Sequence, residues 1–133
     1  MKRFVLADTG PLYAAADPSD QHHRRAQDDI GRLAAEGLAV TVVWPIFLET
    51  YTLVRRRLGH GAAQTWLRDL ATSARLLTPG DRDYAEAIRQ TADHPDRTLT
   101  LFDTLLGAVS KRLALPVWSY DPHFKMLRVP LWR

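Results

Sequence analysis

Cysteine is absent from this 133-residue sequence. Its absence excludes a disulfide framework and zinc sites built on cysteine, and it fits a reducing compartment such as the cytoplasm. Long apolar runs are absent too, because none approaches the ~20 residues that a transmembrane helix needs. Asp8 interrupts the first apolar run too early for a signal peptide. We therefore expect a soluble, cytoplasmic protein that has no membrane partner.

Lysine is scarce, and arginine supplies most of the basic side chains. The only lysines are Lys2, Lys111 and Lys125, although Lys and Arg together number 18 against 15 acidic residues. The resulting net charge of +3 is compatible with a polyanionic partner without identifying one. Arginine forks suit bidentate contacts to phosphate, but a coding bias toward Arg and Ala explains the composition equally well.

Apolar, β-branched runs alternate with helical patterns along the whole chain. Strands are expected over residues 4–7, 38–43, 75–78 and 115–120, with a last edge strand over 127–131. Helices are expected over residues 12–16, 21–36, 45–58, 61–72, 81–92 and 101–113, with Asp20 capping the second of them and Gly37 ending it. This order predicts a three-layer α/β/α sandwich with a mostly parallel sheet, in a single domain over residues 1–133.

Two carboxylates follow directly after predicted strands. Asp8 ends the run Phe4–Ala7, and Asp121 follows the run Val117–Tyr120. In an open α/β sheet, ligands bind outside the carboxyl ends of the strands, so both acids lie where chemistry is expected. Asp121-Pro122 is also an ordinary opening of a turn, and that interpretation stays open.

Two further acids lie on helix faces that a fold alone would leave apolar. Glu49 shares its face with Ile46 and Leu53, and Asp103 lies near a helix start beside Leu106. An unpaired carboxylate on a core-facing stripe is costly unless it binds something. A helix N-terminus stabilises a carboxylate such as Asp103 by only about 0.3–1 kcal/mol, so we favour a functional role for both acids.

The remaining polar candidates have simpler interpretations. We interpret Asp28, Asp29, Glu36, Asp69 and Glu86 as solvated helix acids. His22 and His23 lack an acidic partner at metal-ligand spacing, so a surface-helix role is favoured. Basic helix ends are interpreted as solvated rather than as an RNA path, and tryptophans as core or dimer packing: Arg55–Arg57, Lys111, Arg112, Trp44, Trp66, Trp118 and Trp132.

Four acids therefore point toward one edge of the predicted sheet: Asp8, Glu49, Asp103 and Asp121. Four uncompensated like charges would destabilise the fold or raise the pKa values of the carboxyls. A hard divalent cation resolves this, and oxygen ligands without His or Cys suit Mg²⁺ or Mn²⁺. An acid-lined site of this kind predicts transfer at phosphorus through a metal-activated water.

The sequence resembles PIN-domain ribonucleases, and more closely the VapC-type toxins of toxin–antitoxin pairs. The resemblance covers nearly the whole chain and rests on four motifs in order: Asp8-Thr9-Gly10, Glu49, Thr100–Asp103 and Ser119–Phe124. It implies a PIN-like fold, Mg²⁺- or Mn²⁺-dependent endoribonuclease activity and products with 5′-phosphate and 3′-hydroxyl ends. It also implies a homodimer and a small antitoxin whose tail crosses the active site.

The resemblance also implies roles for single residues. Asp8 and Asp103 would be the principal metal ligands, Glu49 a ligand or the holder of a water, and Asp121 an outer acid on a water or second metal. We accordingly interpret Asp8 as a metal ligand rather than as a nucleophile or a helix cap.

Three more residues resemble supporting positions of the family. Thr9 would orient Asp8 or contact a phosphate through its hydroxyl. Ser119 stands where the family often has Thr, and it keeps the hydroxyl. Asp96 resembles an extra acid of some members, although a loop pairing with Arg97 explains it equally well.

Two other functions are compatible with parts of this pattern. A phosphatase of the haloacid dehalogenase type also has an Asp after its first strand, but it needs a second Asp where this sequence has Gly10. A catalytically weak PIN module that binds RNA or an antitoxin would keep the acids without cleaving RNA.

Overall fold

The computed structural model describes residues 3–95 and 98–133. Its strands are β1 (Arg3–Ala7), β2 (Leu38–Val43), β3 (Arg75–Leu77) and β4 (Val117–Trp118). Its helices are α1 (Thr9–Ala16), α2 (His23–Ala35), α3 (Trp44–Leu58), α4 (His60–Ser73), α5 (Asp81–Asp93), α6 (Leu101–Leu113) and the 3₁₀ helix η1 (Pro122–Leu127).

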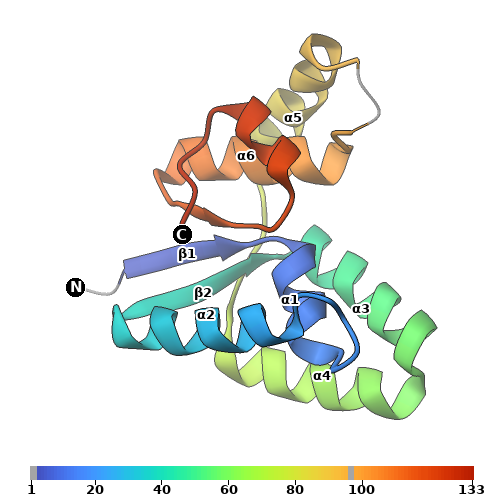
Figure 1. The fold of residues 1–133 in the computed structure, drawn as a ribbon. Coiled ribbons are helices and arrows are strands. Elements are labelled where there is room, and N and C mark those ends of the chain that lie inside the picture. Colours follow the sequence, from blue (N-terminus) through green and yellow to red (C-terminus); the bar gives the residue numbers. More distant parts are fainter. Residues whose placement is uncertain (1–2, 96–97) are drawn as a thin grey trace.

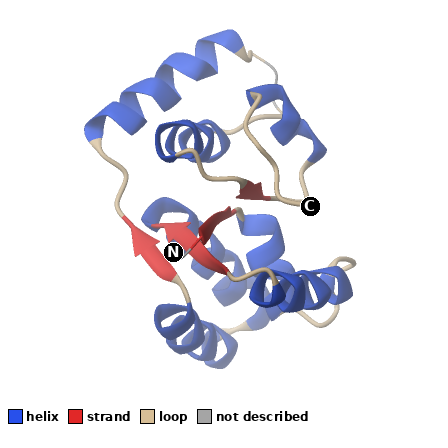
Figure 2. Ribbon diagram, turned by 90° about the vertical axis from the view of Figure 1, so that its left-hand side faces the viewer, coloured by secondary structure: helices blue, strands red, loops and turns tan. Residues whose placement is uncertain are grey.

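The four strands form one parallel sheet in the order β3-β2-β1-β4. Right-handed crossovers require the helices between β1 and β3 to lie on one face and those between β3 and β4 on the other. Figures 1 and 2 show this arrangement, with α5 and α6 on one side of the sheet and α1 to α4 on the opposite side. The predicted α/β/α sandwich is confirmed.

The hydrophobic core lies against both faces of the central strands. Val5 and Leu6 of β1 are fully buried, because helices pack on the sheet from both sides. One connected cluster of buried residues extends through the sheet and both helical layers, and among its fully buried members are Val42, Val43, Ile46, Val54, Leu106, Val109, Val117 and Phe124. This packed interior fixes the ends of β1 and β4 relative to the helices that begin beside them.

The C-terminal segment differs from the prediction. The last full strand, β4, has two residues. Instead of the expected edge strand over 127–131, the 3₁₀ helix η1 ends at Leu127 and an irregular segment follows it. Phe124 and Leu127 are both buried at a spacing of three, which matches the period of a 3₁₀ turn. Leu131 keeps a single parallel bridge to Val117. Helix α6 approaches η1 closely at Gly107, since a Cβ there would lie 3.1 Å from Leu127 Cδ1.

The start of α2 also differs from the prediction, whereas its end agrees. The helix begins at His23, and the Asp20 carboxylate accepts the His22 N–H at 2.8 Å in the turn before it, so Asp20 is not the cap. Gly37 follows the helix with φ +71°, the left-handed conformation expected of a residue that ends a helix.

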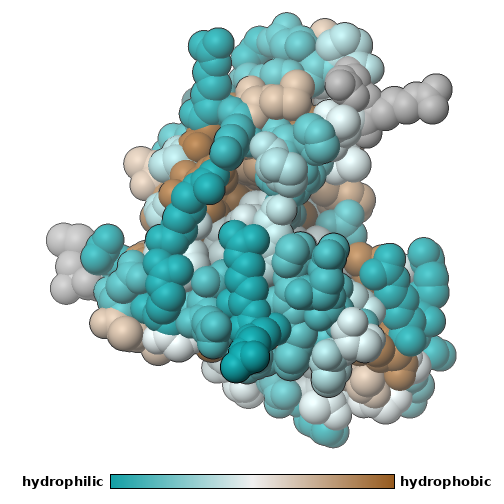
Figure 3. Space-filling model, in the orientation of Figure 1, coloured by the Kyte–Doolittle hydropathy of each residue, from teal (hydrophilic) through white to brown (hydrophobic). Residues whose placement is uncertain are grey.

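The face of the molecule drawn in Figure 3 is mostly hydrophilic, and its apolar atoms are confined to separate patches. Among the described residues, none of the helices combines the length and the apolar character needed to cross a membrane.

Candidate active site

The candidate site lies where the chain reverses its direction across the sheet. Strand β1 pairs with β2 on one side and with β4 on the other. The chain continues from β1 to β2 and β3 on one side, and it then crosses back over the sheet to form β4 on the other side. In open parallel sheets, the crevice at the carboxyl ends of two such strands is the usual place for a ligand. Asp8 follows β1 and Ser119 follows β4, and the Ser119 hydroxyl donates to Asp8 Oδ2 at 2.8 Å.

Asp8 is buried, with 7% of its surface exposed. It stands at the N-cap of α1, and its Oδ1 accepts the Thr9 N–H at 2.8 Å, so the interpretation that it is not a cap was wrong. Burial raises its pKa to about 6, and the charges of Asp103 and Glu49 act in the same direction. The hydrogen bonds from Ser119 and Thr9 oppose this shift without cancelling it.

Glu49 lies half-buried on α3, facing the end of β1. The Thr9 hydroxyl donates to Glu49 Oε1, and the Thr50 hydroxyl lies 3.3 Å from the Thr9 hydroxyl oxygen. Burial raises the pKa of Glu49, and the charge of Asp103 adds to the shift. Thr9 therefore connects two acids, with its N–H on Asp8 and its hydroxyl on Glu49, whereas the sequence suggested that this hydroxyl serves Asp8 or a phosphate.

Asp103 caps a helix and also belongs to the acidic cluster, the name we use for Asp8, Glu49, Asp103 and Asp121. Its Oδ2 accepts the Thr100 N–H at 2.9 Å, and the Thr100 hydroxyl accepts the Asp103 N–H at 3.2 Å, which forms a capping box at the start of α6. Burial raises the pKa of Asp103, and the charge of Asp121 contributes to the shift. Asp103 therefore does have a structural role as a capping residue, but its carboxylate remains poorly solvated and close to other acids.

Asp121 lies half-buried at the outer side of the cluster. It caps η1, where its Oδ1 accepts the His123 N–H at 2.9 Å and lies 3.0 Å from His123 Nδ1. Its own N–H donates to the Ser119 hydroxyl oxygen at 3.1 Å. Ser119 thus links Asp121 to Asp8, and the turn interpretation of Asp121 holds together with its place beside Asp103.

The inner acids, Asp8, Glu49 and Asp103, lie in an environment that is poor in positive charge where the structure describes it. Within residues 3–95 and 98–133, no ion pair involves Asp8, Glu49 or Asp103. The described residues contain no group of three acidic or histidine side chains already close enough to hold a metal ion. Mg²⁺ does not need one, because it keeps several waters and takes one or two carboxylates directly. The oxygen-only donor set and the raised pKa values therefore fit Mg²⁺ or Mn²⁺.

Other polar candidates lie outside the cluster. Asp69 is exposed on α4, and Glu86 pairs with Arg89 on α5, as expected of solvated acids. His23 Nδ1 lies 2.7 Å from the Ala14 carbonyl oxygen, and the His22 ring packs against the ring of Tyr120. Both histidines therefore have structural roles. Asp96 lies outside the described residues.

Three of the basic and aromatic candidates also have structural explanations. Arg112 forms a two-pronged ion pair with the buried Asp83, at 2.7 and 2.8 Å. Trp66 and Trp118 are buried in the core, whereas Trp44 on α3 is 40% exposed.

Asp29 was wrongly interpreted as a solvated acid. It is 7% exposed, and its Oδ2 accepts the Tyr120 hydroxyl at 2.6 Å and the Trp118 indole N–H at 3.1 Å. These bonds hold the segment that carries Ser119. The sequence contained the signal, because Asp29 lies three residues before Arg32 but also four before Leu33, on the buried stripe of α2.

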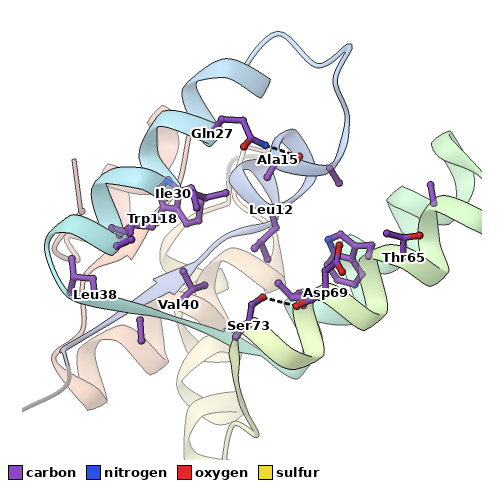
Figure 4. A pocket seen from close by; sticks show the side chains of 18 residues that line it. Leu12, Ala15, Gln27, Ile30, Leu38, Val40, Thr65, Asp69, Ser73 and Trp118 are labelled. Carbon is purple, nitrogen blue, oxygen red and sulfur yellow. Dashed lines mark hydrogen bonds between the residues drawn. The ribbon is translucent and has the colours of Figure 1, made fainter.

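A large apolar groove lies away from the acids, between α2 and α4. Its volume is about 690 Å³, and its lining is mostly apolar. Figure 4 shows Leu12, Ile30 and Val40 around it, from α1, α2 and β2. Ile30 is 43% exposed, so the groove presents apolar surface to solvent. Such a surface suits an apolar partner rather than acid chemistry.

No protein-family model matches the sequence, and no curated protein matches it. Solved structures do match the fold. The VapC20 toxin of Mycobacterium tuberculosis, described as cleaving the sarcin–ricin loop, superposes with a TM-score of 0.83 at 24% identity, over 97% of this chain and 98% of that chain. The chain has a PIN-like fold.

Two further structures share the PIN-like fold. VapBC2 from Rickettsia felis, solved bound to a DNA fragment from its promoter, has a TM-score of 0.76 at 12% identity, over 97% of both chains. FitAcB from Neisseria gonorrhoeae has a TM-score of 0.70 at 18% identity, over 97% of this chain and 96% of that chain. The resemblance to PIN-domain proteins is therefore confirmed at the level of the fold.

Proposed function

We propose that the protein is a Mg²⁺- or Mn²⁺-dependent endoribonuclease, and the toxin of a type II toxin–antitoxin pair. The observation that carries this proposal is the convergence of Asp8, Glu49 and Asp103, whose pKa values are all raised and which have no cationic partner in the described residues. The fold shared with VapC20 supports the assignment.

Each acid has a proposed task. Asp8 and Asp103 would hold the cation, and Asp121 would hold a water or a second ion at the outer side. A bound Mg²⁺ or Mn²⁺ would polarise the phosphoryl oxygen and lower the pKa of the attacking water. Ser119 fixes one oxygen of Asp8, and the Thr9 N–H fixes the other, so this carboxylate is oriented before RNA arrives.

Glu49 would ligate the cation or hold the attacking water. The hydroxyl of Thr9 fixes one of its oxygens. Burial raises its pKa, and a carboxylate with a raised pKa accepts a proton more readily near neutral pH. Gly10 lies in the first turn of α1, where a Cβ would lie 3.9 Å from Tyr120 Cβ, so the absence of a side chain keeps this side of the helix open beside the acids.

We further propose a small antitoxin as the protein partner, and cytoplasmic RNA as the substrate. The resemblance to VapC-type toxins implies the antitoxin, and the fold shared with VapBC2 and FitAcB supports it. A homodimer is proposed as well. The exposed apolar side chains of Leu48 on α3 and Leu101 on α6, which are 58% and 52% exposed, supply surface for such contacts.

Cleavage of RNA tests the proposal. Wild-type protein incubated with total RNA and Mg²⁺ or Mn²⁺ should release fragments with 5′-phosphate ends, and a chelator should stop the reaction. Asp8→Ala and Asp103→Ala should abolish cleavage, whereas Asp69→Ala, an exposed acid on α4, should leave it unchanged. Equal cleavage by all four proteins would refute the proposal, and RNA binding without cleavage by the wild type would indicate a binding module.

A further inference from the structure

A second hollow opens directly beside the acidic cluster, and we call it the basic hollow. Its volume is about 190 Å³, and three cationic side chains line it: Arg25, Lys125 and Arg133. Ser119 and Asp121 line it too, so it shares two residues with the acidic site. Typical pockets for small molecules have about 300–1,000 Å³, so the basic hollow fits one group of a longer ligand.

The side chains that line the basic hollow carry an excess of positive charge. No ion pair in the part of the chain that the structure describes involves Arg25, Lys125 or Arg133, and all three residues are exposed. Asp121 is the single carboxylate side chain of the lining. Three cationic side chains against one acidic side chain favour an anionic group in the hollow.

Tyr120 and Trp132 form the aromatic wall of the basic hollow, and hydrogen bonds hold both side chains in place. Tyr120 donates its hydroxyl to the buried Asp29 at 2.6 Å, and the Arg25 guanidinium lies 4.1 Å from the centre of the Tyr120 ring. Trp132 donates its indole N–H to Glu36 at 3.1 Å. Side chains fixed in this way lose little conformational freedom when a ligand binds, which favours binding.

We propose that the basic hollow binds a phosphodiester group of single-stranded RNA next to the group that the acidic cluster cleaves. This inference rests on the proposed function. The hollow shares Ser119 and Asp121 with the acidic cluster, so one strand would occupy both. Arginine forks match phosphate oxygens. The exposed Arg25 guanidinium, which lies over the Tyr120 ring, also offers a flat surface on which an RNA base can stack. An acidic protein segment would use the same cations, and the titration below separates this alternative from RNA.

Binding of a labelled single-stranded RNA decanucleotide of mixed sequence tests the inference. Fluorescence anisotropy in a chelator measures binding without cleavage. Lys125→Ala should weaken binding and lower the slope of log K against log salt by about 0.7, the value for one phosphate contact on a single strand. The Arg25→Gln/Lys125→Ala double variant should bind about tenfold more weakly and lose about twice that slope.

Two control variants separate loss of the contact from loss of structure. Lys125→Arg keeps the charge on η1 and should retain the binding of the wild type. Lys111→Ala removes the same charge from an exposed position on α6 that does not line the basic hollow, and it should bind like the wild type. Equal binding by the Lys125→Ala and Lys111→Ala variants would overturn the inference, as would the absence of RNA binding by the wild type at low salt.

The remaining outcomes distinguish the possible ligands. A decaglutamate peptide is titrated in parallel, and loss of peptide binding but not of RNA binding in the double variant would overturn the inference in favour of an acidic protein partner. The proposed function fails separately. If the wild type binds RNA through the basic hollow but never cleaves it, the inference stands and the nuclease assignment falls. If the double variant cleaves RNA with the KM of the wild type, the nuclease assignment stands and the inference about the basic hollow falls.

Discussion

Asp8→Asn removes a carboxylate that the metal-free fold holds at an energetic cost. Burial and the neighbouring acids raise the pKa of Asp8 from 3.8 to about 6. Below the unfolded value the carboxyl is protonated in both states, so the fold suffers no penalty there. As the pH rises through the folded value, the folded state must ionise a buried group, and the free energy of unfolding decreases. The full penalty therefore acts above about pH 6.

The magnitude follows from the shift. A difference of about two pKa units corresponds to about 3 kcal/mol at pH values above both. Asparagine cannot accept from both Thr9 and Ser119 as the carboxylate does, and one weakened hydrogen bond costs about 1 kcal/mol. We therefore expect Asp8→Asn to stabilise the metal-free protein by about 2 kcal/mol, which corresponds to a rise in Tm of about 6–10 °C for a chain of this length.

Thermal unfolding in a chelator measures this effect. At about pH 8 the variant should melt at a higher temperature than the wild type, and at about pH 4 most of the difference should disappear. Excess Mg²⁺ should raise the Tm of the wild type more than that of the variant. Asp69→Asn, which changes an exposed acid on α4, should have no comparable effect. The reasoning is refuted if Asp8→Asn melts at or below the wild-type temperature at pH 8.

Two further substitutions test the packing that supports the site. Arg112→Ala leaves the buried Asp83 without its ion pair and should lower the free energy of unfolding by about 1–3 kcal/mol, measured by urea unfolding, so an unchanged midpoint contradicts this. Gly107→Ala places a methyl group 3.1 Å from Leu127 Cδ1, whereas Gly61→Ala meets nothing within 4 Å. Both variants gain helix propensity, so Gly107→Ala should have the lower Tm of the two, and equal melting temperatures would refute this contact argument.

The sequence was sufficient to predict the layers of the fold and the position of the acids at the carboxyl edge of the sheet. Apolar runs alternating with helical patterns predicted a parallel sheet, and the carboxyl ends of parallel strands meet at one edge. The pattern alone therefore placed Asp8 beside the segment that carries Asp121. Glu49 and Asp103 were predictable for a different reason, since each interrupts an apolar helix face.

The predictions for Asp29 and for the C-terminal edge strand were wrong. The first applied the rule about acids on apolar helix faces too narrowly, and the second depends on tertiary contacts. Asp29 interrupts the buried stripe of α2 just as Glu49 interrupts that of α3, but the acidic and basic residues around it suggested a solvated face. The expected edge strand over 127–131 is reduced to the single bridge of Leu131, because η1 extends to Leu127 and buries that side chain together with Phe124. An apolar run alone does not distinguish these two arrangements.

The basic hollow had no signal in the sequence. Arg25 lies on α2, Lys125 on η1 and Arg133 after the last bridge of the sheet, and only the folded chain brings them to one cavity. The hydrogen bond from Ser119 to Asp8 was likewise unpredictable as a contact, because it joins residues that are 111 positions apart.

Direct titration of Mn²⁺ is the measurement closest to the central claim that the acids at the carboxyl edge of the sheet form a site for a divalent cation. Electron paramagnetic resonance counts free Mn²⁺ without any need for RNA or for turnover. The wild type and the Asp69→Asn control should bind Mn²⁺ with the same Kd, whereas Asp8→Asn and Asp103→Asn should each raise the Kd by about tenfold or more. The same Kd for all four proteins would contradict the account.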